Sequence, residues 1–251
     1  MSQTQELSGK VALITGSGKN IGRAIALSLA EAGASISINT RSSETEAQSV
    51  RSEILSHGGK AEVFIADITD PNSVKTMIEG TIAAFGRLDI LVLNASVRRE
   101  VKFIDMDFEE WRRVMSTSLD ASFHCIKACL PHLIKAGAGH IITIGGDGAL
   151  DGSIGKAHSS TAKCGLIGLG KALAKELAPH QIRVNCVSPG AINTTRPSHR
   201  TVRSTNAPHI PLGRYGEPEE IAAGVRFLCG PGGGFMTGQV IHMNGGTLMG
   251  H

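Results

Sequence analysis

Aromatic side chains make up only 4% of this 251-residue sequence, which contains one tyrosine, Tyr215, and one tryptophan. No apolar run approaches the roughly 20 residues that a membrane span needs, and residues 1–10 lack the apolar core of a signal peptide. The formal charge of +3 is small and dispersed, which argues against a nucleic-acid partner. A hydrophobic fraction of 41% with nearly balanced charge excludes a disordered chain. We therefore expect a folded protein that binds neither membrane nor nucleic acid.

The cysteines are odd in number and sit in apolar segments, so we expect reduced, buried thiols in a cytoplasmic protein. They are Cys125, Cys129, Cys164, Cys186 and Cys229. His124 and His132 lie near the first two and raise the alternative of a metal site. No further ligand cluster supports that alternative, and the sequence predicts no bound metal.

Short runs rich in Val and Ile alternate with amphipathic stretches from end to end. The predicted strands are Val11–Thr15, Ser35–Thr40, Ala61–Ala66, Ile90–Leu93, His140–Ile144, Arg183–Val187 and Gln239–His242. The predicted helices are Ile21–Ala32, Glu44–His57, Pro71–Phe85, Asp107–Lys135, Lys156–Ala178 and Pro218–Leu228. This alternation predicts an α/β fold, a single-domain, Rossmann-like, doubly wound sheet of about seven parallel strands with helices on both faces.

A glycine-rich turn, Thr15–Gly22, joins the first predicted strand to the first helix. Glycines let a backbone approach a pyrophosphate, which then sits at the helix N-terminus. An NAD site carries an Asp or Glu at the end of the second strand, where this sequence has Asn39, Thr40 and Arg41, with Lys19 in the turn. Two cations and no carboxylate favour NADP(H). The alternative is that both cations are ordinary solvated charges.

These motifs resemble those of the short-chain dehydrogenase/reductase family, over essentially the whole chain. Gly16, Gly18 and Gly22 fall in the family's TGxxxGxG turn, with Asn20 in place of its middle glycine. Further matches are Asp67 after the third strand, the triplet Asn94-Ala95-Ser96 after the fourth, with Ser96 in place of a glycine, and the segment Pro189–Thr194.

The resemblance implies how a cofactor would be held. In the family, the Asp67 position contacts the adenine, and the Ile192 and Thr194 positions hold the nicotinamide carboxamide. The cofactor residues predicted in this way are Gly16, Ser17, Lys19, Asn20, Ile21, Gly22, Arg41, Asp67, Ile68, Asn94, Ala95, Lys163, Pro189, Gly190, Ile192 and Thr194.

The family's chemistry uses an Asn, a Ser, a Tyr and a Lys, and the resemblance implies where each would stand here. Lys163 matches the Lys, which in the family lowers the pKa of the Tyr and binds the nicotinamide ribose. The proton-donating Tyr is matched by Ser159, the substrate-binding Ser by Gly146 and the Asn by Ser118. Tyr215 lies in a turn before the last predicted helix and is not expected to replace the Tyr. Three of the four positions therefore differ from the family pattern.

Nearby groups offer replacements for the acid. His158 precedes the Tyr position and has an ordinary pKa of about 6.5, while Asp147 follows the Ser position and Asp151 lies four residues beyond. We predict catalytic roles for Lys163, Ser159, His158 and Asp147. The alternatives are that His158 only caps or packs at the helix start, and that the aspartates are solvated loop carboxylates.

Residues 191–214 lack regular periodicity, and four prolines fall between positions 189 and 211, which predicts a substrate lid. No Asp or Glu occurs between Glu176 and Glu217. The stretch contains Arg183, Arg196, His199, Arg200, Arg203, His209 and Arg214. Together with Arg98, Arg99 and Lys102 they suggest an anionic small-molecule substrate. The alternative is a solvated basic loop or a subunit contact.

We therefore expect an NADP(H)-dependent oxidoreductase with a non-standard proton relay, which acts on a carbonyl or alcohol group. Two alternatives stay open: an NADP(H)-binding pseudoenzyme or inactive partner subunit, and a lyase or isomerase on the same fold. The resemblance also implies a homo-oligomer, a tetramer or dimer, built on helices 107–135 and 156–178.

Overall fold

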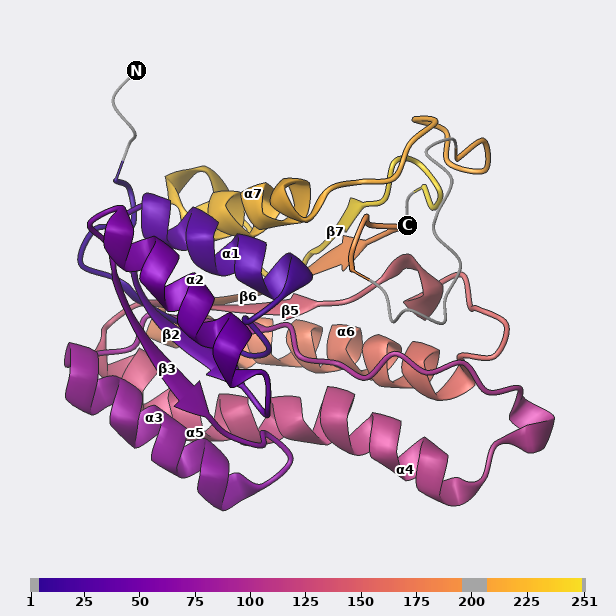
Figure 1. Cartoon of the computed structure of the whole chain (residues 1–251), viewed down its shortest axis with the longest axis horizontal. Coiled ribbons are helices and arrows are strands. Elements are labelled where there is room, and N and C mark those ends of the chain that lie inside the picture. Colours follow the sequence, from indigo (N-terminus) through magenta and orange to yellow (C-terminus); the bar gives the residue numbers. More distant parts are fainter. Residues whose placement is uncertain (1–4, 196–206, 250–251) are drawn as a thin grey trace.

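A seven-stranded parallel sheet forms the middle layer of the computed structural model, which describes residues 5–195 and 207–249. The strands follow the order β3-β2-β1-β4-β5-β6-β7 (Figure 1). Their bounds are β1 Val11–Ile14, β2 Ser35–Thr40, β3 Lys60–Ile65, β4 Ile90–Leu93, β5 Gly139–Ile144, β6 Ile182–Pro189 and β7 Val240–Met243. The predicted single-domain, doubly wound fold is confirmed.

Helices cover both faces of this sheet (Figure 1). On one face lie α1 (Asn20–Glu31), α2 (Glu44–Ser56) and α7 (Pro218–Cys229). On the other lie α3 (Pro71–Phe85), α5 (Ala121–Lys135) and α6 (Ala157–Leu177), with α4 (Phe108–Met115) leading into α5. No helix in the described residues is long and apolar enough to cross a membrane.

The strand sequences explain why both faces are covered. Successive residues of a strand point to opposite faces of the sheet. In β1, Ala12 and Ile14 pack with α1, α2 and α7, whereas Val11 and Leu13 pack with α3, α5 and α6. All four residues of β1 are buried, as a central strand covered by helices on both sides requires. The edge strands β3 and β7 are only partly buried.

The long helix predicted over Asp107–Lys135 is interrupted. The Asp107 side chain accepts a hydrogen bond from the Glu110 backbone at 2.7 Å and starts α4. Residues Ser116–Asp120 then form one π-helical turn before α5 begins. The periodicity of apolar residues does not reveal the wider hydrogen-bond ring of a π turn, so the sequence predicted one uninterrupted helix here.

The prediction that all cysteines are buried is wrong at one position. Cys125, Cys129, Cys186 and Cys229 are buried, but Cys164 is exposed on α6. It directly follows Lys163, which is turned toward the sheet, so the helix turns Cys164 outward. The described residues contain no group of three or more His, Cys, Asp and Glu side chains that could hold a metal ion.

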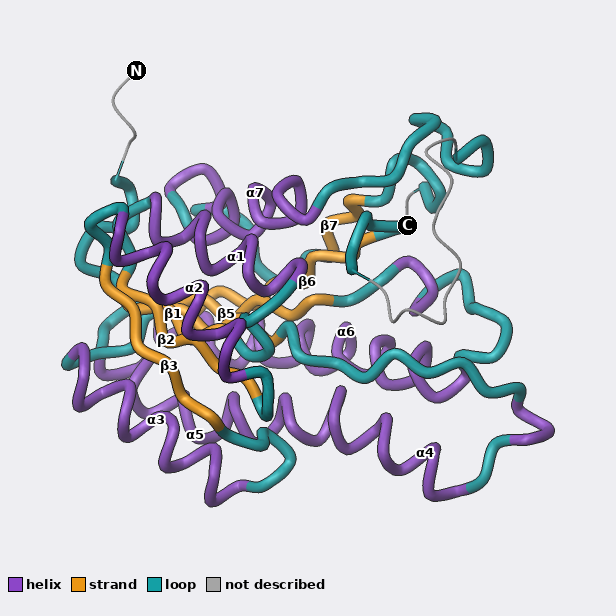
Figure 2. Tube along the Cα trace, viewed as in Figure 1, coloured by secondary structure: helices purple, strands orange, loops and turns teal. Residues whose placement is uncertain are grey.

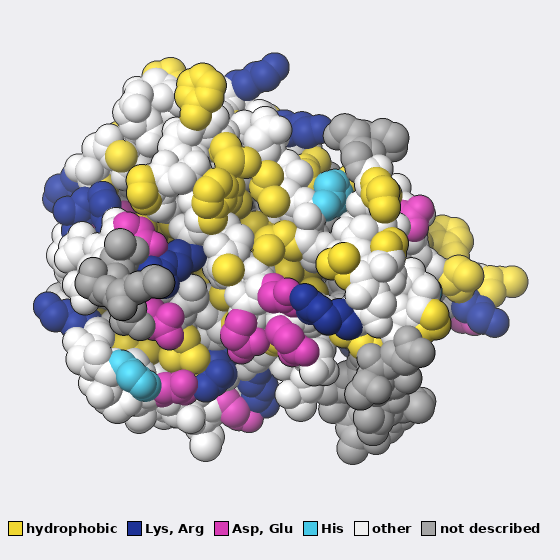
Figure 3. Space-filling model, turned by 90° about the horizontal axis from the view of Figure 1, so that it is seen from above, with side chains coloured by type: hydrophobic (Ala, Val, Ile, Leu, Met, Phe, Trp, Pro, Cys, Tyr) yellow, Lys and Arg dark blue, Asp and Glu magenta, His cyan; other side chains and the backbone are white. Residues whose placement is uncertain are grey.

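Loops gather at the carboxyl ends of the strands (Figure 2). The chain winds away from β1 in opposite directions, because β2 and β4 both pair with β1. Ligands of such sheets bind in the crevice where this reversal occurs. From the side of α1, α2 and α7, basic and acidic side chains are interspersed over the described surface (Figure 3).

Candidate active site

Two adjoining cavities occupy the crevice at the carboxyl ends of the strands. One, of about 400 Å³, runs from the turn after β1 to the ends of β2 and β3. The other, of about 230 Å³, lies between the loop after β5, the start of α6 and the end of β6. Ile21, Asn94 and Arg98 line both cavities. We call the first the nucleotide groove and the second the reaction pocket.

The turn after β1 is built for close approach of a ligand. Gly16 has φ +63°, a left-handed conformation that favours glycine. A Cβ at Gly22 would lie 2.3 Å from the Gly16 carbonyl oxygen, so no larger residue fits there. The Asn94 amide donates to the carbonyls of Thr15 and Gly16 at 3.0 and 2.9 Å. This amide fixes the turn against the end of β4.

Asn20 accounts for the departure from the family's glycine pattern. Its φ is +51°, a left-handed value that asparagine tolerates better than most side chains. Its Oδ1 also accepts a hydrogen bond from the Thr195 backbone amide at 2.8 Å. Asparagine therefore keeps the backbone shape of the turn and adds a link to the segment after β6.

The end of β2 offers no carboxylate for a ribose. Asn39 is buried, and its amide donates to the carbonyls of Phe64 and Ala66 at 3.3 and 3.2 Å. Lys19 and Arg41 both line the nucleotide groove. Lys19 Nζ lies 2.5 Å from Glu46 Oε1, and its ammonium lowers the pKa of that exposed carboxyl.

The groove fits NADP(H) on these observations. A glycine cradle faces the start of a helix, and β2 ends without the carboxylate that an NAD site carries there. Two exposed cations, Lys19 and Arg41, line the groove instead and could pair with a 2′-phosphate. Arg41 Nη1 lies 4.0 Å from Asp67 Oδ2, so its present partner is weakly held. A 2′-phosphate can replace such exposed partners at little cost, because exposed ion pairs are weak.

Most of the predicted cofactor residues line the two cavities. Those in the nucleotide groove are Gly16, Lys19, Asn20, Ile21, Gly22, Arg41, Asp67, Ile68, Asn94 and Ala95. Lys163, Pro189, Gly190 and Ile192 line the reaction pocket. Ser17 is buried beneath the turn and donates to the Ile14 carbonyl at 2.8 Å, which makes its side chain structural. Thr194 Oγ1 accepts from Arg98 Nη1 at 3.1 Å.

Lys163 is the central polar group of the reaction pocket. It projects from α6 toward the end of β5, where its Nζ donates to the carbonyls of Ile144 and Gly145. Burial lowers the pKa of this ammonium to about 8, and the positive charge of Arg98 acts in the same direction. Lys163 is thus poised to gain or lose a proton near neutral pH.

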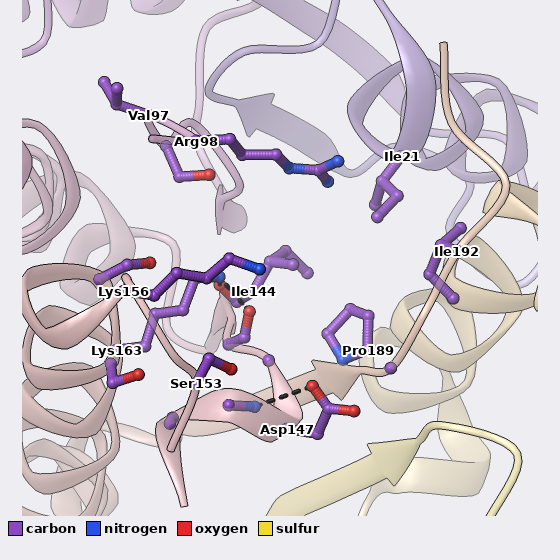
Figure 4. Close-up of a pocket in the computed structure, with 18 of the residues that line it drawn as sticks. Ile21, Val97, Arg98, Ile144, Asp147, Ser153, Lys156, Lys163, Pro189 and Ile192 are labelled. Carbon is purple, nitrogen blue, oxygen red and sulfur yellow. Dashed lines mark hydrogen bonds between the residues drawn. The ribbon is translucent and has the colours of Figure 1, made fainter. Parts of the chain in front are cut away.

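Ser159 and Asp147 also line the reaction pocket. Asp147 is held by two hydrogen bonds, from the Gly148 amide at 2.8 Å and from Thr247 Oγ1 at 3.1 Å (the first is drawn in Figure 4). Asp147 is therefore a half-buried carboxylate whose position is fixed by these two bonds, and its catalytic role stays a prediction. Gly146 precedes it with φ 161°, an extended conformation open to any residue.

His158 lines neither cavity. It is fully buried, its Nδ1 accepts from the Ser159 amide at 2.8 Å, and its Nε2 lies 3.6 Å from Glu110 Oε1 on α4. Arg99 Nε contacts the same carboxylate oxygen at 2.7 Å. The structure thus favours a capping and packing position for His158, whose catalytic role stays a prediction.

The position matched to the family's Asn falls in the π turn. Ser118 is buried there, and its carbonyl accepts from Ser122 Oγ at 3.0 Å. π turns occur frequently at functional sites. Tyr215 lies away from both cavities, with its ring edge-on to His209 at 6.1 Å between centroids.

The predicted basic stretch divides into separate environments. Arg183 does not face the site, because its guanidinium donates to the carbonyls of Leu228, Gly233 and Met236 and joins β6 to the segment after α7. Arg214 pairs with Glu220 at 2.7 Å. Residues 196–206 lie outside the described residues, and with them Arg196, His199, Arg200 and Arg203.

Known proteins that are similar in sequence agree with this geometry. The family described as enoyl-(acyl carrier protein) reductase matches residues 16–247. The chain is 41% identical over 243 residues to the 3-oxoacyl-[acyl-carrier-protein] reductase FabG of Escherichia coli K12, covering 96% of this chain and 98% of that protein. It is 38% identical over 244 residues to the 3-oxoacyl-[acyl-carrier-protein] reductase of Synechocystis, covering 97% and 98%.

Solved structures similar to this chain point the same way as these sequences. A crystal structure of a short chain dehydrogenase from Burkholderia cenocepacia J2315, in complex with NADP, has a TM-score of 0.90 at 32% identity and covers 96% of this chain and 99% of that one. The chain belongs to the short-chain dehydrogenase/reductase family. A dehydrogenase/reductase from Sinorhizobium meliloti 1021 matches equally well, with a TM-score of 0.90 at 34% identity and 98% coverage of both chains.

Sequence reasoning missed several parts of this short-chain dehydrogenase/reductase site. Thr247 reaches Asp147 from the C-terminal segment, 100 residues away along the chain. Glu110 joins α4 to Arg99 and His158. These contacts carry no local signal, because they depend on which loops meet at the carboxyl end of the sheet. The link between Asn20 and Thr195 had a local signal, an asparagine where the family has glycine.

Proposed function

We propose that this short-chain dehydrogenase/reductase catalyses the NADP(H)-dependent reduction of a carbonyl group, through a proton relay that lacks the family's tyrosine. Lys163 carries the proposal: a buried ammonium, held by two backbone carbonyls, with a pKa lowered to about 8. Burying a charge costs several kcal/mol, and such perturbed groups cluster at functional sites. A chain that kept only its fold would have no need of this lysine.

The residues that would hold NADP(H) follow from the two cavities. The turn around Gly16 and Gly22 would hold the diphosphate, and Lys19 and Arg41 the 2′-phosphate. Asp67 would contact the adenine, and the segment Pro189–Thr194 the nicotinamide. When bound, the reduced cofactor supplies a hydride to the substrate carbon.

The substrate oxygen then needs a proton, and Ser159 and Lys163 are the groups we assign to this transfer. A serine hydroxyl ends well short of a tyrosine phenol and is a weaker acid. A water in the 230 Å³ reaction pocket, held between Ser159 and Lys163, would span the difference. Asp147, fixed by Gly148 and Thr247, would hold that water and stabilise the protonated Lys163.

The substrate class follows from the relatives and from the pocket charges. The relatives named above are 3-oxoacyl-[acyl-carrier-protein] reductases, so a 3-oxoacyl thioester is the first compound to test. Arg99 and Lys156 line the pocket and are held by Glu110 and Glu100 at 2.7 and 3.3 Å. An anionic substrate would compete for these cations, which supports a small carboxylate or phosphate compound as the second class.

We also propose a cytoplasmic homo-oligomer. Phe108 on α4 and Phe123 on α5 are exposed over 73% and 54% of their surface. Exposed aromatic side chains on neighbouring helices are typical of surfaces that pack against another copy. Residues 191–214 remain our proposed substrate lid, of which the structure describes 191–195 and 207–214.

The test is steady-state oxidation of NADPH across a panel of 3-oxoacyl thioesters, 3-oxo acids and simple ketones. Lys163→Met should abolish turnover of any active compound. Lys171→Met, an exposed lysine on the same helix, should leave it unchanged. A compound that is turned over equally by the wild type and by Lys163→Met would overturn the proposal.

A second candidate is an NADP(H)-binding pseudoenzyme or inactive partner subunit. It is favoured by the three replaced positions, Ser118, Gly146 and Ser159. The replacements at Gly146 and Ser159 remove the groups that donate to the substrate oxygen in the family. It predicts that NADPH binds and that no compound of the panel is turned over. A lyase or isomerase, the remaining alternative, would instead turn over its substrate without added NADPH.

A further inference from the structure

Arg98 is a cation at the boundary of the two cavities that affects the relay described above only through its charge. Arg98 follows β4 and lines both the nucleotide groove and the reaction pocket. Its Nη1 donates to Thr194 Oγ1, across the crevice from β4 to the segment after β6. In the close-up its guanidinium extends toward Ile21, which lines the same two cavities (Figure 4).

Ile21 is the second residue of α1, so the guanidinium extends toward the start of that helix. The connection is also direct along the chain: Thr194 accepts from Arg98, and the next residue, Thr195, donates its backbone amide to Asn20, the first residue of α1. Arg98 and the start of α1 are thus tied to the same two-residue segment.

This arrangement brings two sources of positive potential together. The N-terminus of a helix carries roughly half a positive charge, and the first turn of α1 contains no acidic residue that would offset it. A guanidinium directed at the same region adds a full charge. An anion between them would neutralise both, and the glycine turn leaves its backbone open to such an anion.

We propose that Arg98 binds the diphosphate of NADP(H), as a side-chain clamp that closes over the cofactor opposite the start of α1. This inference rests on the proposed function, because it assumes that the groove holds NADP(H). It assigns Arg98 to the cofactor and not to an anionic substrate. The 2′-phosphate would instead be held by Lys19 and Arg41, which also line the groove.

Three ligands separate the parts of the cofactor. NADPH contains the 2′-phosphate, the diphosphate and the nicotinamide. The second ligand, 2′-phospho-ADP-ribose, lacks only the nicotinamide. The third, adenosine 2′-monophosphate, keeps the 2′-phosphate and lacks both phosphates of the diphosphate. Isothermal titration of each ligand into the wild type, Arg98→Gln and Arg98→Lys measures binding without turnover. Lys102→Gln is the matched control, since Lys102 is an exposed cation of the same loop that lines neither cavity.

Arg98→Gln should raise the Kd of NADPH and of 2′-phospho-ADP-ribose by the same factor, about ten- to a hundredfold, as expected for a charge-assisted hydrogen bond. The Kd of adenosine 2′-monophosphate should stay within about twofold of the wild type. Arg98→Lys should lose less than Arg98→Gln, because it keeps the charge but not the forked donor. Lys102→Gln should bind all three ligands as the wild type does.

Other outcomes overturn the clamp. Weaker binding of NADPH alone would place Arg98 at the nicotinamide. Equal weakening of all three ligands would make its effect a general one on the groove. Unchanged binding with a raised KM for substrate would assign it to the substrate. If the wild type binds none of the three ligands, the proposed function itself fails, which is a distinct result.

Discussion

Restoring the two missing family groups, with Gly146→Ser and Ser159→Tyr together, should raise carbonyl reductase activity. The structure has room for the serine. A Cβ at Gly146 would lie 3.6 Å from Lys163 Nζ, 3.7 Å from Lys163 Cδ and 3.8 Å from the Pro189 carbonyl oxygen, all ordinary van der Waals contacts. Its φ of 161° imposes no strain on a serine. At position 159 the side chain faces the reaction pocket, one helical turn before Lys163.

The size of the gain follows from the chemistry supplied. A positioned general acid contributes about 10²–10⁴-fold to a rate, and one donor to a developing oxyanion about 10²–10³-fold. The two groups act on the same oxygen, so their effects will not multiply fully. We expect a rise in kcat/KM of about 10²–10⁴-fold for a 3-oxoacyl thioester, measured as the rate at which NADPH absorbance is lost.

Two controls isolate the phenol. Gly146→Ser with Ser159→Phe introduces the same ring without its hydroxyl and should give no more than a small part of the gain. Gly146→Ser with Thr161→Tyr places a phenol on an exposed residue of α6 that lines neither cavity. A double variant that folds and binds NADPH with the wild-type Kd, yet reduces no faster than its Phe counterpart, would refute the inference that this pocket aligns substrate and cofactor as the family does.

The remaining predictions concern single groups of the site. The reduction rate should fall as the pH rises through about 8, where Lys163 loses its proton. Lys163→Arg should move this fall in the pH profile of kcat to higher pH. If the fall does not move, another group is responsible for the titration. Folding lowers the pKa of Lys163 from 10.5 to about 8. The free energy of unfolding of the wild type in urea, relative to that of Lys163→Met, should therefore increase as the pH rises from about 8 to 10.5. The reverse trend would contradict a buried ammonium. Glu46→Gln should release Lys19 and tighten NADPH binding a few-fold without changing NADH binding. Arg41→Ala should weaken the binding of NADPH and leave the binding of NADH unchanged. Equal effects on the two cofactors would contradict a 2′-phosphate site. Asn20→Ala should destabilise the fold by about 1–2 kcal/mol because of its left-handed backbone, and Asn20→Gly should not; equal losses would show that the bond to Thr195 dominates.

The sequence predicted the sheet closely because its signals are local. The ranges Ser35–Thr40 and Ile90–Leu93 agree with β2 and β4, and Pro71–Phe85 agrees with α3, which Asp70 caps and Gly86 ends. The π turn at Ser116–Asp120 and the outward position of Cys164 escaped it. Both depend on the exact rotation of a helix against the sheet, which a repeat of about 3.6 residues does not specify to within one residue.

Sequence alone determined the fold class, the glycine turn and the identity of the residues at positions 146, 159 and 163, because these follow from residue type and order. Tertiary structure decided what those residues can do. In the folded chain His158 faces Glu110 and does not line the pocket. Arg183 lies outside the site, where it donates to three backbone carbonyls. It also brought Thr247 to Asp147 and Arg98 to Thr194. Such pairs come from loops far apart in the chain, so only the packing of the sheet and its crossovers brings their side chains together.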